Sequence, residues 1–188
     1  MYKTLPIALC LGLAVTLASA AEVAGVLVED EVRSESGQQL LLNGAGLREK
    51  LWVDVYVGSL YLPQKSTDVA EILSRPWAWR MQLDFVYKEV SRDKLLDSWR
   101  EGFEKNQSAE TLQQLQARIE QFYQYFDSSA LARDRYRFDY DPASGTRISK
   151  NGDALGVIPG EDFAAALLEI WIGNYPADKG LKKSLLGG

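Results

Sequence analysis

The chain has 188 residues, with 21 Lys and Arg against 26 Asp and Glu, a net charge of −5, one Cys and no His. The lack of His excludes Ser-His-Asp triads, Cys-His pairs and His-ligated zinc or haem. The acidic pI of about 4.9 argues against nucleic acid as a partner, because such binding depends on a basic surface.

The first 20 residues have the layout of a secretory signal peptide. Lys3 supplies a positive start, and residues 5–18 form an apolar run that is shorter than the roughly 20 residues of a membrane-spanning helix. Ala18 and Ala20 place small side chains just before a cut after Ala20. We predict cleavage near Ala20 and a periplasmic or secreted product, rather than a chain held by an N-terminal membrane anchor. Cys10 leaves with this leader, which excludes disulfides and thiol chemistry.

Residues 21–188 remain after cleavage, and they predict a single domain with no stable membrane span. The expected elements of its first half are a strand within residues 21–33, a short strand over 38–43, a long strand over 51–62, a short helix over 66–73 and a half-buried strand over 77–87. The long strand is rich in β-branched and aromatic residues and stops at Pro63. Gly58 within this strand indicates a bulge or a close backbone approach.

The second half of the domain predicts helices, then a meander, then helices. Ser91 and Ser108 are the expected N-caps of two helices that form a hairpin around Asn106-Gln107. The elements that follow are strands over residues 135–141 and 146–150, a third strand after Asn151-Gly152, a deeply buried helix over 161–172 and a short last helix after Pro176. This order predicts an α+β fold, in which a layer of helices covers one face of a large antiparallel β-sheet.

Two motifs resemble cofactor or metal sites but do not fit them. The segment 42–46 begins like a dinucleotide fingerprint, yet Glu49 stands in place of the third glycine and a strand follows instead of a helix. We interpret its two glycines as a turn from one strand to the next. The segment 139–145 lacks the ligand spacing of a calcium loop and contains Pro142, so it is interpreted as a hairpin. No cofactor and no metal are expected.

Arg48 is the main candidate for a ligand-binding residue. It precedes the most apolar strand, where a guanidinium suits one carboxylate or enolate through charge-assisted hydrogen bonds. Tyr56 lies further along, on the same face as Trp52 if the pairing is regular, and its hydroxyl can share the anion. The alternative is that Arg48 is an ordinary surface arginine.

Aromatic residues are concentrated in the same part of the chain. They either line a ligand cleft or belong to the core, and the pattern alone leaves both interpretations open. The residues are Trp52, Tyr56, Tyr61, Trp77, Trp79 and Phe85.

Arg48 and Tyr56 lie in motifs that resemble the chalcone isomerase family. Gly44-Ala-Gly-Leu-Arg48 followed by Val55-Tyr-Val-Gly-Ser-Leu-Tyr-Leu62 resembles the start of that fold. Leu168-Glu-Ile-Trp-Ile-Gly173 and Lys182-Lys-Ser-Leu185 resemble its C-terminal helices. The resemblance covers residues 21–188 and is nearest to the bacterial, exported chalcone isomerase-like proteins. It implies a large antiparallel sheet backed by helices, with a cleft between them.

The resemblance also implies roles for individual residues. In plant chalcone isomerases an arginine attracts the reacting phenolate, whereas related fatty-acid binders use that arginine and a tyrosine to hold a carboxylate. Arg48 matches the arginine, and Tyr56 falls where the binders have their tyrosine and the enzymes a threonine. The enzymes' catalytic tyrosine has no match in residues 88–91, and their late threonine falls near Ala154 or Leu155.

The expected function is therefore non-catalytic binding of a fatty acid or similar amphipathic carboxylate, with its acid group held by Arg48 and Tyr56. One alternative is an isomerase, an intramolecular lyase in which Arg48 activates a phenolate and serves as the catalytic residue. The other is an interaction module of the cell envelope that binds an unidentified protein through its acidic surface and helical hairpin.

Overall fold

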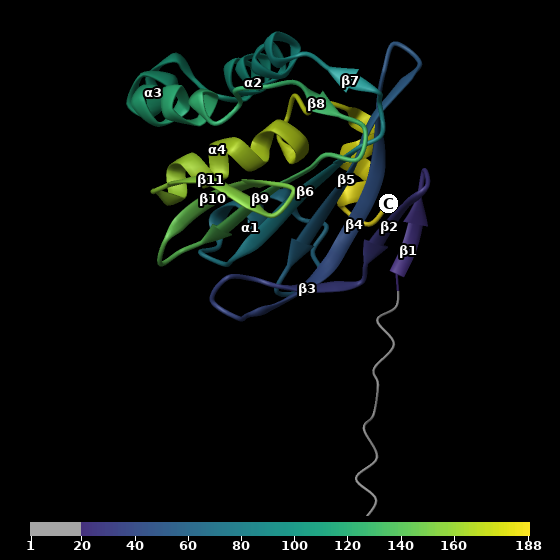
Figure 1. Cartoon of the computed structure of the whole chain (residues 1–188). Helices are drawn as coiled ribbons and strands as arrows, with labels where there is room; N and C mark the ends of the chain where they lie inside the picture. Colours follow the sequence, from purple (N-terminus) through teal and green to yellow (C-terminus); the bar gives the residue numbers. More distant parts are fainter. Residues whose placement is uncertain (1–19) are drawn as a thin grey trace, which may run out of the picture.

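A computed structural model of the chain describes residues 20–188, so the predicted signal peptide lies outside the described residues except for Ala20. Its centre is a seven-stranded antiparallel sheet in the order β11-β10-β9-β6-β5-β4-β3 (Figure 1). The strands of this sheet are β3 (Glu31–Arg33), β4 (Gln39–Lys50), β5 (Val53–Leu62), β6 (Trp79–Phe85), β9 (Arg135–Asp141), β10 (Gly145–Lys150) and β11 (Asp153–Ile158). Two further sheets have two strands each: the hairpin of β1 (Ala20–Val23) with β2 (Val26–Glu29), and the pair of β7 (Glu89–Val90) with β8 (Ala130–Leu131), which helices separate in sequence.

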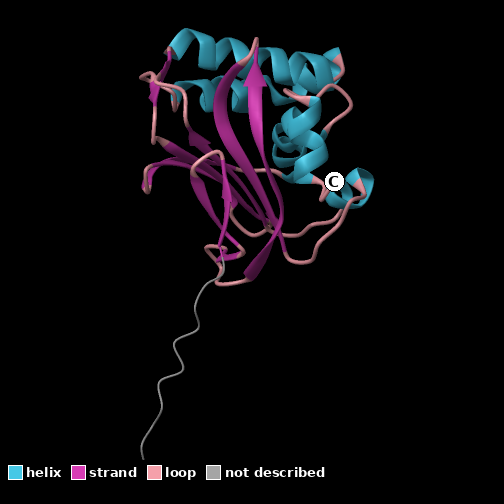
Figure 2. Ribbon diagram, turned by 90° about the vertical axis from the view of Figure 1, so that its right-hand side faces the viewer, coloured by secondary structure: helices cyan, strands magenta, loops and turns pink. Residues whose placement is uncertain are grey.

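Helices cover one face of this sheet, as Figures 1 and 2 show. They are α1 (Val69–Ser74), α2 (Arg92–Asn106), α3 (Ala109–Gln124), α4 (Glu161–Ile172) and α5 (Lys179–Leu185). The apolar helix α4 lies between the sheet and the α2–α3 hairpin, and Trp171, Phe163 and Leu167 are fully buried on it. The side chains of Ser91 and Ser108 cap α2 and α3, as predicted. The α+β fold with helices on one face of an antiparallel sheet is confirmed.

Strand β6 differs from the prediction, because all seven of its residues are buried and not only those on one face. Its polar side chains pair with side chains of the neighbouring strand β9 instead of facing water. Arg80 Nε donates to Asp139 at 2.5 Å, Arg135 Nε donates to Asp84 at 2.5 Å, and Arg137 Nε donates to Gln82 at 3.0 Å. The alternation of residue types along β6 therefore distinguishes an apolar face from a face whose polar side chains pair with side chains of β9.

The two glycines predicted to form a turn lie instead in the middle of β4. A Cβ atom on Gly44 would be 2.0 Å from the carbonyl oxygen of Ser184, and one on Gly46 would be 2.6 Å from Ser184 Cβ. Helix α5 therefore packs directly on the backbone of β4. Gly58 on β5 gives the close approach that was predicted, since its missing Cβ leaves room for Leu181. We call Gly44, Gly46 and Gly58 the glycine strip.

A β-bulge at Asn43 stabilises one end of the contact between α5 and β4. The register of β4 against β5 skips Asn43, whose side chain is thereby free to bond elsewhere. Asn43 Nδ2 donates to the carbonyl oxygens of Ser66 at 3.0 Å and Leu185 at 2.7 Å, and Oδ1 accepts from the Ser66 amide at 2.8 Å. One buried amide thus joins β4, the segment before α1 and the end of α5.

The turn between β4 and β5 consists of Leu51 and Trp52. Lys50 pairs with Val53, so the loop has two residues, and their φ angles are +52° and +66°. Such a turn normally carries Asn-Gly, because left-handed φ values cost other residues about 1 kcal/mol or more each. Leu51 is 85% exposed and Trp52 is 98% exposed. Trp52 therefore does not share a sheet face with Tyr56, contrary to the regular pairing assumed above.

Candidate ligand-binding site

Arg48 and Tyr56 are direct cross-strand partners on β4 and β5. The next pair is Glu49 with Asp54, so Val55 is an extra residue on β5 and forms a second β-bulge. The amides of Val86 and Tyr87 both donate to the Val55 carbonyl, at 3.0 and 3.2 Å. Bulges redirect side chains, and here both Val55 and Tyr56 are buried on the side of the sheet that the helices cover.

The Arg48 side chain is directed into the protein, and the residue is only 9% exposed. Its Cζ atom lies 5.4 Å from the centre of the Tyr56 ring, a distance that allows a cation–π interaction. Its Nε is buried without a hydrogen-bond partner among the described residues. None of the ion pairs among residues 20–188 includes Arg48. Arg48 is therefore a buried cation with unused hydrogen-bonding capacity.

Tyr56 is buried beneath this guanidinium. Its hydroxyl accepts a hydrogen bond from Trp171 Nε1 at 2.9 Å. Burial raises the pKa of Tyr56 above its usual value of 10.0, and the smaller opposing effects of Arg48 and the Trp171 bond do not cancel that rise. The phenol therefore keeps its proton at neutral pH. It can donate that proton in a hydrogen bond, but it is a poor general base.

Replacing Tyr56 by Phe is expected to lower the free energy of unfolding by about 1–3 kcal/mol, because the buried Trp171 N–H loses its acceptor. Tyr61→Phe is the matched control. Tyr61 is also fully buried on β5, but its hydroxyl has no partner among the described residues, so its removal is expected to be neutral or stabilising. Urea titration of both variants measures the difference. Equal losses would show that the Tyr56–Trp171 bond contributes nothing specific.

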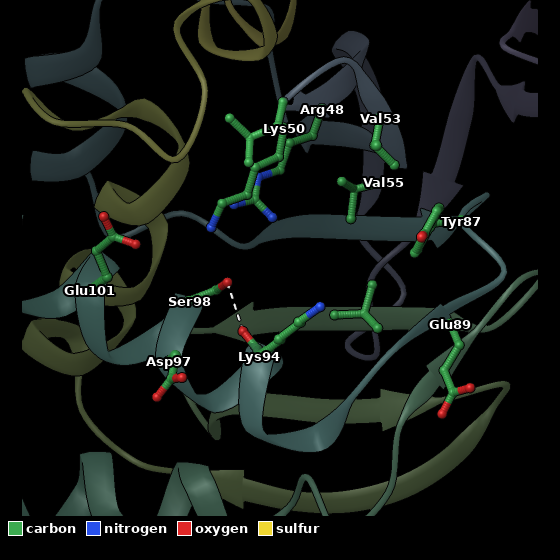
Figure 3. Close-up of a pocket in the computed structure, with 12 residues that line it drawn as sticks. Arg48, Lys50, Val53, Val55, Tyr87, Glu89, Lys94, Asp97, Ser98 and Glu101 are labelled. Carbon is green, nitrogen blue, oxygen red and sulfur yellow. Dashed lines mark hydrogen bonds between the residues drawn. The ribbon is translucent and has the colours of Figure 1, made fainter.

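A pocket of about 370 Å³ opens beside Arg48, between it and α2, and this volume is within the range of small-molecule sites (Figure 3). Val53, Val55 and Tyr87 form an apolar wall, while Arg48 and Lys50 face α2 across the opening. The lining residues are Arg48, Lys50, Leu51, Val53, Val55, Tyr87, Glu89, Val90, Lys94, Asp97, Ser98 and Glu101. The pocket thus combines apolar surface with a buried cation.

Two smaller cavities adjoin this pocket, and Arg48 and Ser98 line all three. One, of about 20 Å³, reaches Tyr56 and Trp99 between the sheet and the helices. The other, of about 120 Å³, extends toward Tyr175. Arg48 therefore lies where the open pocket meets the interior.

Carboxylates on α2 balance part of the positive charge at the pocket. Glu101 pairs with Lys105 at 2.6 Å, and Lys105 is the main reason that the pKa of Glu101 is lowered. Lys50 and Arg48 lower it further by smaller amounts. The positive potential of Arg48 and Lys50 thus extends across the pocket, where a bound anion would also experience it.

The structure brings the two predicted site residues together but does not assemble the predicted aromatic cleft. Of the six aromatic residues, Tyr56 and Phe85 line the cavity of about 20 Å³, and none lines the pocket of about 370 Å³. Tyr61 packs on the other side of the sheet, Trp79 lies in the core, and Trp77 stacks with the Arg75 guanidinium at 4.9 Å.

Sequence reasoning missed the contribution of α2 to the site. Lys94, Ser98 and Glu101 follow a spacing of four and three residues, which places them on one side of the helix. This spacing was the signal in the sequence from which the contribution of α2 could have been predicted. Residues 20–188 contain no cluster of three or more potential metal ligands. Within the same range, no helix is both long and apolar enough to cross a bilayer.

Comparisons with known proteins agree with this architecture. The model of the chalcone isomerase-like family matches residues 20–187. The crystal structure of a fatty-acid binding protein from Arabidopsis thaliana superposes with a TM-score of 0.61 and 17% sequence identity, covering 83% of this chain and 95% of that one. No curated protein matches the sequence. Because the family match spans nearly the whole chain, this protein belongs to the chalcone isomerase-like family.

Proposed function

We propose that this protein is exported and binds a fatty acid or a similar amphipathic carboxylate without transforming it. The observation that carries the proposal is the buried Arg48 guanidinium, which has no ion-pair partner in residues 20–188 and lies in an apolar pocket. In the proposed complex the ligand's carboxylate pairs with Arg48, and the Tyr56 hydroxyl donates to the same group after a small rearrangement. The tail occupies the pocket between β5 and α2.

The free energies of the two ends of such a ligand support this arrangement. Burying a charged carboxylate costs several kcal/mol unless a partner compensates it, and Arg48 is such a partner. Each CH2 group buried against Val53, Val55 and Tyr87 adds about 0.8 kcal/mol. A purely apolar molecule would not pair with Arg48, and a small polar molecule would not fill the apolar part of the pocket.

The structural comparison supports the choice of ligand class. The Arabidopsis thaliana protein with this fold is named a fatty-acid binding protein. At 17% identity the likeness itself establishes only the fold, so the choice rests on Arg48 and its pocket.

The proposal is non-catalytic because the sequence does not match the tyrosine and the late threonine that the resemblance assigns to the enzymes. Tyr56 keeps its proton at neutral pH, and Ala154 and Leu155 have no hydroxyl where the enzymes have a threonine. Export to the periplasm or the medium rests on the leader of residues 1–20. Protein recovered from the exported fraction and starting at Ala21 would test it.

Calorimetric titration with dodecanoic acid and with its methyl ester tests the binding proposal. The two probes share an acyl chain but differ in charge, so the acid is expected to bind at least about tenfold more tightly if Arg48 holds the carboxylate. Equal affinities, or binding of neither probe, would contradict the proposal. Cyclisation of a chalcone faster than its spontaneous rate would show that the protein is an enzyme.

A further inference from the structure

The β4–β5 turn presents two large apolar side chains to water. Trp52 and Leu51 are almost fully exposed, and both have left-handed φ angles that Asn-Gly would adopt without strain. Because Asn-Gly would form this turn with less strain, the stability of the fold does not explain the presence of Leu and Trp here. A contact with a partner outside the folded domain explains it.

This turn is continuous with the mouth of the pocket. Leu51, in the turn, and Val53, next to it, both line the pocket. Tyr87 also lines the pocket, and its exposed side chain is held beside β5 by the hydrogen bond from its amide to the Val55 carbonyl. Figures 1 and 2 show the β4–β5 hairpin extending to the level of α2, where β7 also lies. We call Leu51, Trp52, Val53 and Tyr87 the apolar tip.

The shape and composition of the apolar tip fit a lipid surface. Its outermost part is the two-residue turn of Leu51 and Trp52, which can penetrate the acyl boundary of a bilayer but offers little area to a protein partner. Trp and Tyr prefer the membrane–water interface, where one end of the ring is apolar and the other is hydrated. Lys50 and Lys94 at the pocket can extend their ammonium groups toward lipid headgroups.

We propose that the apolar tip inserts into the surface of a lipid bilayer and places the mouth of the pocket against it. This inference rests on the proposed function, because it gives an amphipathic acid a path between bilayer and pocket that avoids water. The contact is peripheral, with only the tip in the acyl region. Acidic residues such as Glu89 and Asp97 offset the two lysines at the pocket, so insertion depends on the apolar side chains and needs no anionic lipid.

Vesicles of phosphatidylcholine test this inference directly. Trp52 is the only strongly exposed Trp of the five, so its emission is expected to shift to the blue on vesicle addition and to be quenched by lipids with brominated acyl chains. Trp52→Gly is expected to reduce co-sedimentation with vesicles at least about tenfold. Its melting temperature is expected to stay unchanged or to rise, because Gly adopts the observed φ freely. A loss of vesicle binding then cannot be ascribed to unfolding.

Leu27→Ser is the matched control, since Leu27 is 66% exposed on β2, outside the apolar tip. It is expected to bind vesicles like the unchanged protein. The inference is overturned if the unchanged protein neither sediments with vesicles nor shows quenching. It is also overturned if Trp52→Gly and Leu27→Ser reduce vesicle binding equally.

A second readout separates this inference from the proposed function. Trp52 does not line the pocket, so Trp52→Gly should bind dodecanoic acid in solution with unchanged affinity but acquire it from vesicles at least about tenfold more slowly. If dodecanoic acid does not bind in solution while the vesicle assays succeed, the proposed function fails and membrane insertion stands. Normal acquisition from vesicles by Trp52→Gly would overturn the transfer path.

Discussion

Replacing Arg48 by Ala is expected to weaken the binding of dodecanoic acid at least about 30-fold, because removing one partner of a buried ion pair costs about 2 kcal/mol or more. The variant leaves the carboxylate beside the apolar wall without its buried partner, and Lys50 and Lys94 are the remaining cations of the pocket. The preference for the acid over its methyl ester should shrink in parallel, since the ester never used the charge of Arg48. Calorimetric titration of both probes against both proteins measures the effect.

Two further variants make this result specific to Arg48. Arg48→Lys keeps the charge but loses the planar, two-pronged donor, so it should recover only part of the affinity. Arg75→Ala removes an exposed arginine at the end of α1, where Arg75 pairs with Glu71 at 2.7 Å, and should leave binding unchanged because neither residue lines the pocket. If Arg48→Ala binds dodecanoic acid as tightly as the unchanged protein, Arg48 does not hold the acid group.

Gly44→Ala is expected to lower the free energy of unfolding by about 3 kcal/mol, at the upper end for overpacked sites. The new methyl group would lie 2.0 Å from a backbone oxygen of Ser184, so α5 must move away from the glycine strip or β4 must bend. No change of rotamer relieves a clash between a Cβ atom and backbone. Guanidinium titration followed by circular dichroism measures the loss.

The control for Gly44→Ala is the same substitution at a glycine of α5, the helix that packs on β4. At Gly180 in α5 a Cβ atom would come no closer than 3.2 Å to another residue, the flexible carboxylate of Asp178, and Ala favours the helix by about 1 kcal/mol. Gly180→Ala should therefore be neutral or stabilising. An unchanged stability for Gly44→Ala would mean that α5 does not pack on β4 as described.

Local patterns predicted much of the fold because the relevant interactions are close in sequence. Ser91 and Ser108 cap helices through amides three residues further on, and the meander follows from turn residues such as Asn151-Gly152. The all-apolar pattern of residues 161–172 correctly indicated a buried helix that ends at Gly173. A shared role for Arg48 and Tyr56 was also predicted, but not the turn at Leu51 and Trp52 that makes them cross-strand partners.

Contacts between distant segments account for what the sequence did not predict. The glycines at 44 and 46 suggested a turn, because nothing near them in the chain indicates that α5 packs on their backbone. The actual turn at Leu51 and Trp52 carries none of the residues that mark turns. At the site, the bond from Trp171 to Tyr56 and the contribution of α2 depend on how helices pack on the sheet, which periodicity does not specify.

The partnership between the glycine strip and α5 has a consequence for biosynthesis. The hydrogen bond from Asn43 to Leu185 joins residues 142 positions apart, so β4 and β5 emerge from the ribosome long before the helix that covers them. Until α5 is released, the strip is bare backbone next to apolar side chains, which is the kind of surface that other chains adhere to. A nascent chain that stalls before residue 179 is therefore the form of this protein most in need of a chaperone.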